Sequence, residues 1–225
     1  LNTNVGPEIG VASTKSFTSQ LLVLFLIAIS LGKKFNNLKV NEIEKYIQYI
    51  NMLPGAIAKM LEIESQIISA AQNIKNSKSI IFLGRGYLYP LALEGALKMK
   101  ELSYIHAEGF AAGEMKHGPI ALIEDDLPVI MFLISDGFED KSISNLQEAY
   151  SRGAKIILVA DKTCIEKAPF AHLKIELPEF DNEFKSLLSP LLMSVPAQLL
   201  AYHVAKERGT DVDQPRNLAK SVTVE

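Results

Sequence analysis

Residues 79–104 read SIIFLGRGYLYPLALEGALKMKELSY. The first six form a nearly continuous apolar run that ends at Gly84, which is typical of a strand buried on both faces. Pro90 falls where a helix would have its first turn, and apolar side chains then recur at helical spacing. The stretch therefore predicts a buried strand, a glycine-containing turn and a helix, in the order that opens a βαβ unit.

The rest of the chain repeats this alternation. Apolar strands are expected at residues 128–135, 155–161 and 172–178, and helices at 140–152 and 183–208. Continuous apolar strands that alternate with helices indicate a parallel sheet covered on both faces. The predicted fold class is α/β, a doubly wound parallel sheet flanked by helices.

Three helices are expected before this alternating part. Suitable N-cap residues precede the first of them: Ser13, Thr14 and Ser16. Its apolar run at 21–32 has about a dozen residues where a membrane span needs ~20, so we interpret it as a buried core helix. Residues 40–75 carry the other two helices, with the break between them at Pro54 and Gly55.

Composition narrows the class of partner. The 225 residues carry a net charge of −3 and are 48% hydrophobic, so no surface for nucleic acid or an anionic membrane is expected. Cys164 is the only cysteine, which excludes a disulfide framework and favours a reducing cytoplasm. We expect an unreactive thiol in a loop, at the surface or half-buried. The expected partner is a small molecule or a protein.

Two loops beside the first strand and its helix carry polar groups. GRGYLYP, residues 84–90, follows the strand at the end where ligands collect in parallel sheets, and it is either an anion site or a plain turn. AAGEMKHGP, residues 111–119, contains His117. This imidazole can exchange a proton near neutrality, which suits the opening of a sugar hemiketal, and the alternative is a structural hydrogen bond.

The remaining histidines are weaker candidates. His106 has the same two alternatives as His117, with the structural hydrogen bond preferred, and His172 and His203 are assigned to packing or to the surface. No two histidines stand at helical ligand spacing, so no metal site is expected.

Charged side chains share one face of the helix that follows GRGYLYP. Glu94, Lys98 and Glu101 are spaced i, i+4, i+7 and so point in similar directions. This stripe is either an acid/base site or an exposed pair that supports the helix. Lys220, five residues from the end, would ordinarily be solvated, but on a mobile tail it could close over a pocket and form a Schiff base with a ketone.

Three long segments resemble the C-terminal part of the glucosamine-6-phosphate synthases, the glutamine:fructose-6-phosphate amidotransferase family. They are GPEIGVASTK, FLGRGYLYPLALEGALKMKELSYIHAEGFAAGEMKHGP and GTDVDQPRNLAKSVTVE. The resemblance covers the whole chain and implies sugar isomerase (SIS) domains, three-layer sandwiches of flavodoxin-like type. It implies that residues 1–36 are a helical remnant of a preceding SIS domain, that 37–209 form the second SIS domain, and that 210–225 form a catalytic tail.

The resemblance also implies roles for individual residues. Glu101 would move a proton between sugar carbons C1 and C2, Lys220 would form the Schiff base, and Lys98 would assist near the reacting carbons. His117 would open the ring of a sugar bound to the neighbouring subunit. Other positions would line the sugar pocket: Val11, Ser13 and Ala219.

The implied reaction converts fructose 6-phosphate and ammonia to glucosamine 6-phosphate, the first step toward UDP-N-acetylglucosamine. The resemblance further implies that the protein needs no cofactor and is a homodimer in the cytoplasm. It also implies an N-terminal glutaminase domain, which these residues do not include. The principal phosphate-binding loops of the family are also not among them. Two alternatives stay open, which are a sugar-phosphate-sensing SIS module without turnover and a simple phosphosugar isomerase.

Overall fold

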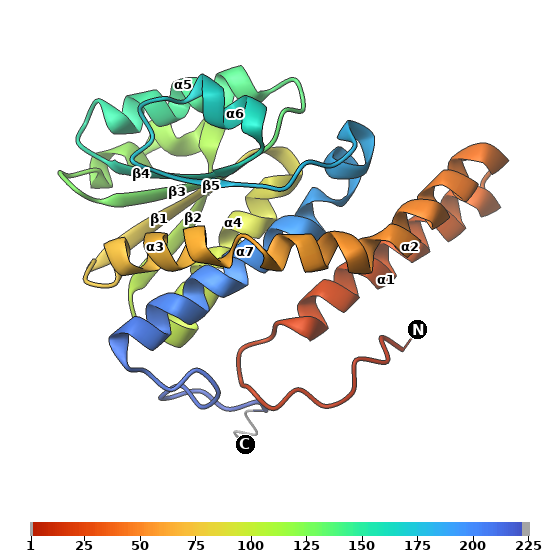
Figure 1. Ribbon diagram of the computed structural model, residues 1–225, viewed down its shortest axis with the longest axis horizontal. Helices are drawn as coiled ribbons and strands as arrows, with labels where there is room; N and C mark the ends of the chain where they lie inside the picture. Colours follow the sequence, from red (N-terminus) through yellow and green to blue (C-terminus); the bar gives the residue numbers. More distant parts are fainter. Residues whose placement is uncertain (1, 222–225) are drawn as a thin grey trace.

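A five-stranded parallel sheet forms the middle of three layers in the computed structural model, which describes residues 2–221 (Figure 1). The strands lie in the order β2-β1-β3-β4-β5. Their bounds are β1 (Ser79–Gly84), β2 (His106–Ala111), β3 (Pro128–Leu133), β4 (Lys155–Ala160) and β5 (Leu173–Glu176). The predicted doubly wound α/β architecture is therefore confirmed, and four of the five strands lie where the sequence predicted them.

Helices cover both faces of the sheet. One face carries α5 (Glu139–Tyr150) and α6 (Lys162–Lys167), and the other carries α3 (Glu64–Ile74), α4 (Tyr89–Ser103) and α7 (Asn182–Arg208) (Figure 1). Side chains of β1 alternate accordingly. Phe82 belongs to the core beneath α4 and α7, where it stacks on Phe132, whereas Leu83 belongs to the core beneath α5.

Strand β2 was not predicted. It pairs in parallel with β1 over its whole length at the edge of the sheet, and Ala107 is its only fully buried residue. An edge strand with one buried side chain has no apolar run to reveal it. Gly109 brings β2 close to α4, since a Cβ there would lie 2.8 Å from the backbone nitrogen of Leu93. Three short 3-10 helices complete the fold: η1 (Gly86–Leu88), η2 (Ala112–His117) and η3 (Pro119–Leu122).

Helix α2 (Val40–Leu61) runs through the predicted break at Pro54 and Gly55, and the break falls after Leu61 instead. A proline inside a helix removes one backbone hydrogen bond. Here Leu53, Ala56 and Met60 are buried and pack into the core with α7. That packing outweighs the local preference for a turn.

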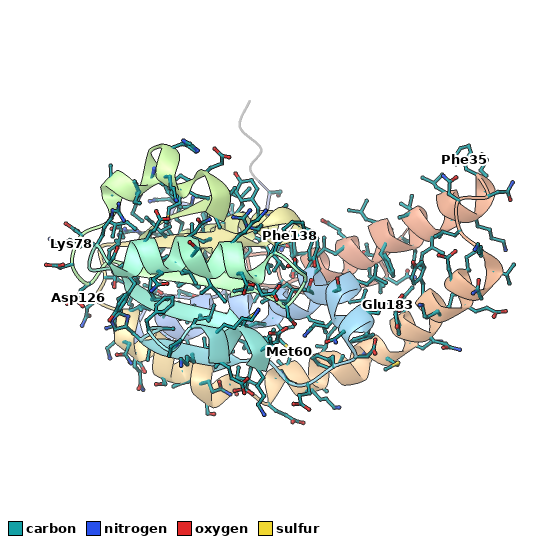
Figure 2. The ribbon with its side chains drawn as sticks, turned by 90° about the horizontal axis from the view of Figure 1, so that it is seen from above. Phe35, Met60, Lys78, Asp126, Phe138 and Glu183 are labelled. Atoms are coloured by element: carbon teal, nitrogen blue, oxygen red, sulfur yellow. The ribbon has the colours of Figure 1, made fainter. Side chains whose placement is uncertain are left out.

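Helix α1 (Lys15–Lys34) begins after Thr14, as predicted, but it is not a buried core helix. With the first half of α2 it projects from the body as a hairpin whose tip carries Phe35 (Figure 2). Ile29 is its only buried residue, and Leu24 is 61% exposed. The apolar run predicted a helix correctly, but it cannot indicate what covers that helix.

Length and apolar composition would allow two helices, α1 and α7, to cross a membrane. Most of α7 is buried in the core of this domain. Core helices of this kind meet the same criterion, and α1 meets it by length and composition alone, which is weak evidence for a membrane span.

Cys164 was expected in a loop at the surface or half-buried, and this was wrong. It lies in α6 and is fully buried. Burial raises the pKa of its thiol, and the neighbouring Asp161 carboxylate raises it further. The assignment of His172 and His203 to packing or to the surface is confirmed, since His172 is exposed and His203 is buried. His172 Nδ1 accepts a hydrogen bond from the backbone of Ile156, and His203 Nε2 lies 2.9 Å from Glu64 Oε1.

Asp161 connects four elements at the carboxyl end of the sheet. Its carboxylate accepts hydrogen bonds from the backbone and hydroxyl of Ser135, from the backbone of Cys164 and from Lys185 Nζ at 2.5 Å. Asp161 and Lys185 are both buried. Burial alone would raise the pKa of Asp161, but Lys185 and the other donors outweigh it and hold the pKa at about 2.

We expect Asp161→Asn to lower the free energy of unfolding by about 3–5 kcal/mol at neutral pH, because it leaves the Lys185 ammonium buried without a counter-ion. The folded pKa lies below the ordinary value of 3.8, so the stabilisation is complete above that value and is lost as pH falls through about 2. Denaturant unfolding of both proteins at neutral and acidic pH measures the difference. The control Asp140→Asn, an 80% exposed carboxylate paired with Lys167, should leave stability nearly unchanged. Equal stability of all three proteins would contradict this role.

Candidate functional site

The charged stripe predicted on α4 is a compact ionic cluster. Lys98 is only 2% exposed, and its Nζ lies 2.5 Å from Glu101 Oε2 and 3.5 Å from Glu94 Oε1. The prediction that the three share one face is confirmed. The alternative, an exposed pair that only supports the helix, is wrong, because the Lys98 side chain is buried.

Glu94 and Glu101 share the Lys98 ammonium unequally. Burial raises the pKa of Glu94, Lys98 opposes that shift, and the charge of Glu101 adds to it. Glu94 Oε1 is buried and accepts no hydrogen bond within the described part of the chain. Glu101 has the shorter contact with Lys98 and is partly exposed. Of the two acids, Glu101 is therefore the more exposed, with 21% of its side chain accessible against 12% for Glu94.

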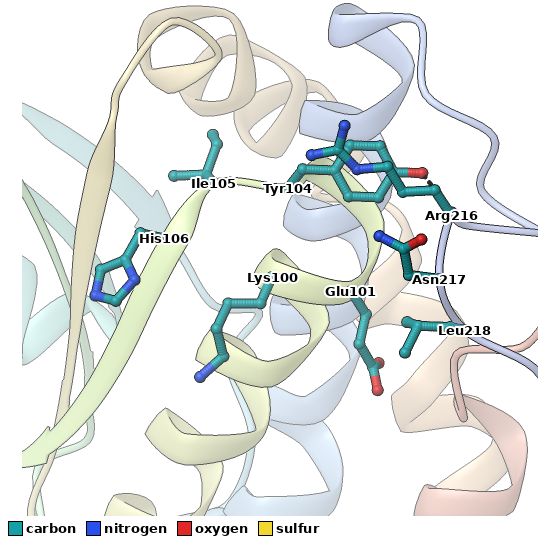
Figure 3. A pocket seen from close by; sticks show the side chains of 8 residues that line it. All are labelled: Lys100, Glu101, Tyr104, Ile105, His106, Arg216, Asn217 and Leu218. Carbon is teal, nitrogen blue, oxygen red and sulfur yellow. Dashed lines mark hydrogen bonds between the residues drawn. The ribbon is translucent and has the colours of Figure 1, made fainter. Parts of the chain in front are cut away.

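The C-terminal tail (residues 210–221) passes over the end of α4 and closes a pocket of about 430 Å³ (Figure 3). Tyr104 ends α4 in a left-handed conformation, with φ 62°. Its ring lies 4.3 Å from the Arg216 guanidinium, and its hydroxyl accepts a hydrogen bond from the Arg216 backbone at 2.8 Å. Farther along the tail, Leu218 lines the pocket together with Glu101. Tyr104 thus anchors the tail at Arg216, four residues before Lys220.

Lys220 lies on the N-terminal loop (residues 7–14). Its Nζ is 3.0 Å from Glu8 Oε2, 3.0 Å from the Gly10 carbonyl and 3.5 Å from the Val11 carbonyl. The backbone of Val11 donates to the carbonyl of Asp213 at 2.9 Å, so loop and tail are also joined directly. Two of the predicted site residues, Lys220 and Val11, are therefore in contact.

Other predicted residues lie around this junction. Ser13 is half-buried between Val11 and α1, and Ala219 is exposed beside Lys220. Within residues 2–221, no hydrogen bond or ion pair joins Lys220 to Glu101. The site of this chain thus consists of two acid–lysine pairs, one on α4 and one between the two ends of the chain.

His117 is exposed at the end of η2, and within the described range it has no hydrogen bond to Glu101, Lys98 or Lys220. Its segment is nevertheless anchored. Met115 is fully buried, and the side-chain amide of Asn145 on α5 donates to the Ala112 carbonyl at 2.7 Å. The chain therefore holds His117 outward rather than toward its own α4 cluster.

The GRGYLYP turn folds partly into η1. Arg85 donates from Nε to the hydroxyl of Ser142 on α5 at 3.0 Å, so its side chain is engaged inside the domain. His106, for which a structural hydrogen bond was the preferred alternative, is the exposed first residue of β2. In the part of the chain that the structure describes, no three metal-ligating side chains come together.

Sequence reasoning missed Glu8. The residue lies six to eight positions before Thr14 and Ser16, and its carboxylate accepts hydrogen bonds from both at the start of α1. Thr14 itself makes no side-chain capping bond. Capping patterns relate residues two or three positions apart, so no local motif would have identified Glu8. Its lysine partner is 212 residues away.

Comparison with known proteins agrees with this fold. The sequence profile described as the SIS domain matches residues 73–208, more than half of the chain. The chain therefore belongs to the SIS domain family. The expected family resemblance is confirmed as well, because the named relatives are isomerizing glutamine–fructose-6-phosphate aminotransferases.

The relative from Agrobacterium fabrum is 50% identical over 222 residues, and the one from Bacteroides thetaiotaomicron is 46% identical over 222 residues. Each alignment covers at least 98% of this chain but 36% of the relative. The chain thus spans about a third of the length of these relatives.

Solved structures give the same result. The C-terminal domain of glucosamine-fructose-6-phosphate aminotransferase from Francisella tularensis is 41% identical, with a TM-score of 0.87 over 94% of this chain and 59% of that one. Glucosamine-6-phosphate deaminase from Thermotoga maritima is 26% identical, with a TM-score of 0.69 over 97% of this chain and 59% of that one. The chain is thus similar to the isomerase part of the aminotransferases.

We expect Asn145→Ala to release the segment that carries His117. The Ala112 carbonyl would lose its buried partner, which costs about 1–3 kcal/mol. Hydrogen exchange at residues 112–117 should become faster, and denaturant unfolding should show the loss of stability. Asn73→Ala, which removes an exposed amide on α3 that also bonds to a backbone carbonyl, should change stability by less than about 0.5 kcal/mol. Unchanged exchange at 112–117 in Asn145→Ala would contradict the anchoring role.

Proposed function

We propose that this chain is the isomerase part of a glutamine:fructose-6-phosphate aminotransferase, which converts fructose 6-phosphate and ammonia to glucosamine 6-phosphate. The observation that carries the proposal is the meeting of both chain ends beside α4, which brings the Lys220 segment next to Val11 and the pocket of Glu101. Identity of 50% to relatives with that name over nearly the whole chain supports it. A cytoplasmic location follows from the proposed metabolic role.

Glu101 and Lys220 are proposed as the catalytic residues. The neutral Lys220 amine adds to the C2 ketone of the open sugar and loses water to form an iminium. Ammonia then displaces the lysine and leaves its nitrogen on C2. Glu101 takes a proton from C1 and returns one to C2, while the C1 hydroxyl loses its proton and becomes the aldehyde. The buried Lys98 ammonium orients Glu101 and stabilises the charge that forms near C1 and C2. Val11, Ser13 and Ala219 are proposed to line the sugar pocket.

His117 is proposed to open the ring of the sugar in the neighbouring subunit of a homodimer. The outward position of this side chain, on a segment anchored by Met115 and Asn145, supports an action outside its own protomer. An imidazole can donate and accept a proton near neutral pH, as the opening of a hemiketal requires.

The proposed division of the chain has three parts. Residues 1–36 would complete a preceding SIS domain, 37–209 form the second SIS domain, and 210–225 form the catalytic tail, of which 222–225 lie outside the described residues. Exposed leucines on α1 support the first boundary, because an apolar helix face of this extent needs a covering surface. Relatives nearly three times as long support a further part that includes a glutaminase domain.

Conversion of fructose 6-phosphate to glucose 6-phosphate tests the catalytic pair without ammonia. In the complete natural polypeptide, Lys220→Ala and Glu101→Gln should each lower the rate about 10²–10⁴-fold, because each removes a group that acts on the reacting carbons. Lys162→Ala, at an exposed lysine on α6, should retain full activity. Sugar binding without turnover in the wild type would instead indicate a sensor.

Co-expression of His117→Ala with Lys220→Ala tests whether the site is shared. Random assembly makes half of the dimers mixed, and one of the two sites in each mixed dimer would be intact, so about a quarter of the wild-type activity should return. If His117 acted within its own subunit, no intact site would form and the mixture would stay as inactive as the single variants.

A further inference from the structure

Both ends of the chain form one buried acidic site at the start of α1. The N-terminal loop and the C-terminal tail lie side by side below the domain (Figure 1), joined by the bond from Val11 to Asp213. At this junction the Glu8 side chain is 8% exposed, whereas that of Lys220 is 45% exposed. The acid is therefore fixed inside the loop, and the lysine reaches it from the solvent side.

The Glu8 carboxylate is held by several donors besides Lys220. Oε1 accepts from the backbone of Thr14 at 2.8 Å and from its hydroxyl at 3.2 Å, and Oε2 accepts from the hydroxyl of Ser16 at 2.6 Å. These donors stand at the N-terminus of α1, where the helix dipole favours an anion. Burial would raise the pKa of Glu8, but Ser16, Thr14 and Lys220 outweigh it and lower the pKa to about 2. Glu8 is thus ionised whenever the protein is folded near neutral pH.

The surroundings of the Lys220 nitrogen suit an ammonium. A protonated amine has three N–H donors, and three oxygens surround Nζ, those of Glu8, Gly10 and Val11. Lys15 is the other cation nearby, and its Nζ bonds to the Pro7 carbonyl instead of Glu8. Asp213, the other acid at this junction, lies close to Gly10 and makes no ion pair with Lys220 among the described residues.

We propose that Glu8 is a positioning residue that holds the Lys220 side chain in an ion pair, and so keeps it from attacking a carbonyl in the resting protein. An amine adds to a carbonyl only through its free electron pair, which an ammonium with three hydrogen bonds does not have. The tail must therefore leave Glu8, and Lys220 must lose its proton, before it attacks. That Lys220 attacks a ketone at all rests on the proposed function, whereas the ion pair between Glu8 and Lys220 does not.

Trace acetylation of the complete natural polypeptide with acetic anhydride at neutral pH tests the proposal directly. Mass spectrometry measures the rate at each lysine, with the exposed Lys162 as internal reference. We expect Lys220 to react more slowly than Lys162 in the wild type and about threefold to tenfold faster in Glu8→Gln than in the wild type. In Glu8→Asp, which keeps the negative charge, Lys220 should be acetylated more slowly than in Glu8→Gln.

Ser16→Ala is the matched control. It removes a hydrogen bond to the same carboxylate without touching the charge, so Lys220 should react as in the wild type. Two results would overturn the proposal. One is equal labelling of Lys220 in the wild type and Glu8→Gln, and the other is a rise in Ser16→Ala as large as in Glu8→Gln, which would mean that loss of the helix cap frees the tail. Circular dichroism of each variant verifies that it is folded.

Borohydride trapping of fructose 6-phosphate on Lys220 separates this proposal from the function. If both hold, Glu8→Gln should trap the sugar faster than the wild type at low sugar concentration. Faster acetylation in Glu8→Gln with no trapped sugar in either protein would support the ion pair and reject the proposed function.

Discussion

Close packing of helix α4 is the constraint on which the rest of the structure depends. The helix lies between the sheet and α7, and glycines make its close contacts possible. A Cβ on Gly109 would lie 2.8 Å from the backbone of α4, too close for any side chain, and one on Gly95 would lie 3.0 Å from the Phe82 ring, which leaves little room. Larger side chains there would push the helix off the sheet. Because α4 cannot shift, Lys98 stays buried and Glu101 stays at the rim of the pocket.

The sequence predicted the central elements of this fold well and its margins poorly. Strands β1, β3 and β4 are continuous apolar runs, since both of their faces are covered. Strand β2 has one covered residue, so its pattern carried no signal. The break predicted at Pro54 and Gly55 was wrong, because the burial of Leu53 and Ala56 against α7 outweighs the local preference of these residues for a turn. For α1 the pattern predicted the helix but not its exposure, because apolar periodicity does not show whether another surface covers a helix.

The same distinction applies to the site. Helical spacing was enough to place Glu94, Lys98 and Glu101 on one face, because all three share one rigid element. It could not show that Lys98 is buried, which depends on how α4 packs. Glu8 was not predictable in any local way, because its partners come from the start of α1 and from the opposite end of the chain. Contacts between distant segments depend on the fold and leave no fixed spacing in the sequence.

The two acid–lysine pairs differ in which partner is able to move. On α4 the lysine is buried and the acid Glu101 is partly exposed, so Lys98 is a fixed charge that orients a reachable carboxylate. At the chain ends the acid is buried and the lysine is exposed on a tail held chiefly at Tyr104 and Asp213. A Schiff-base lysine must bind its substrate, release it and lose a proton in between, which a fully buried ammonium such as that of Lys98 could not do without large cost. The exposure of the two lysines is consistent with the roles proposed for them, Lys220 as the nucleophile and Lys98 as its electrostatic support, and with the proposal that Glu8 defines the resting position of Lys220.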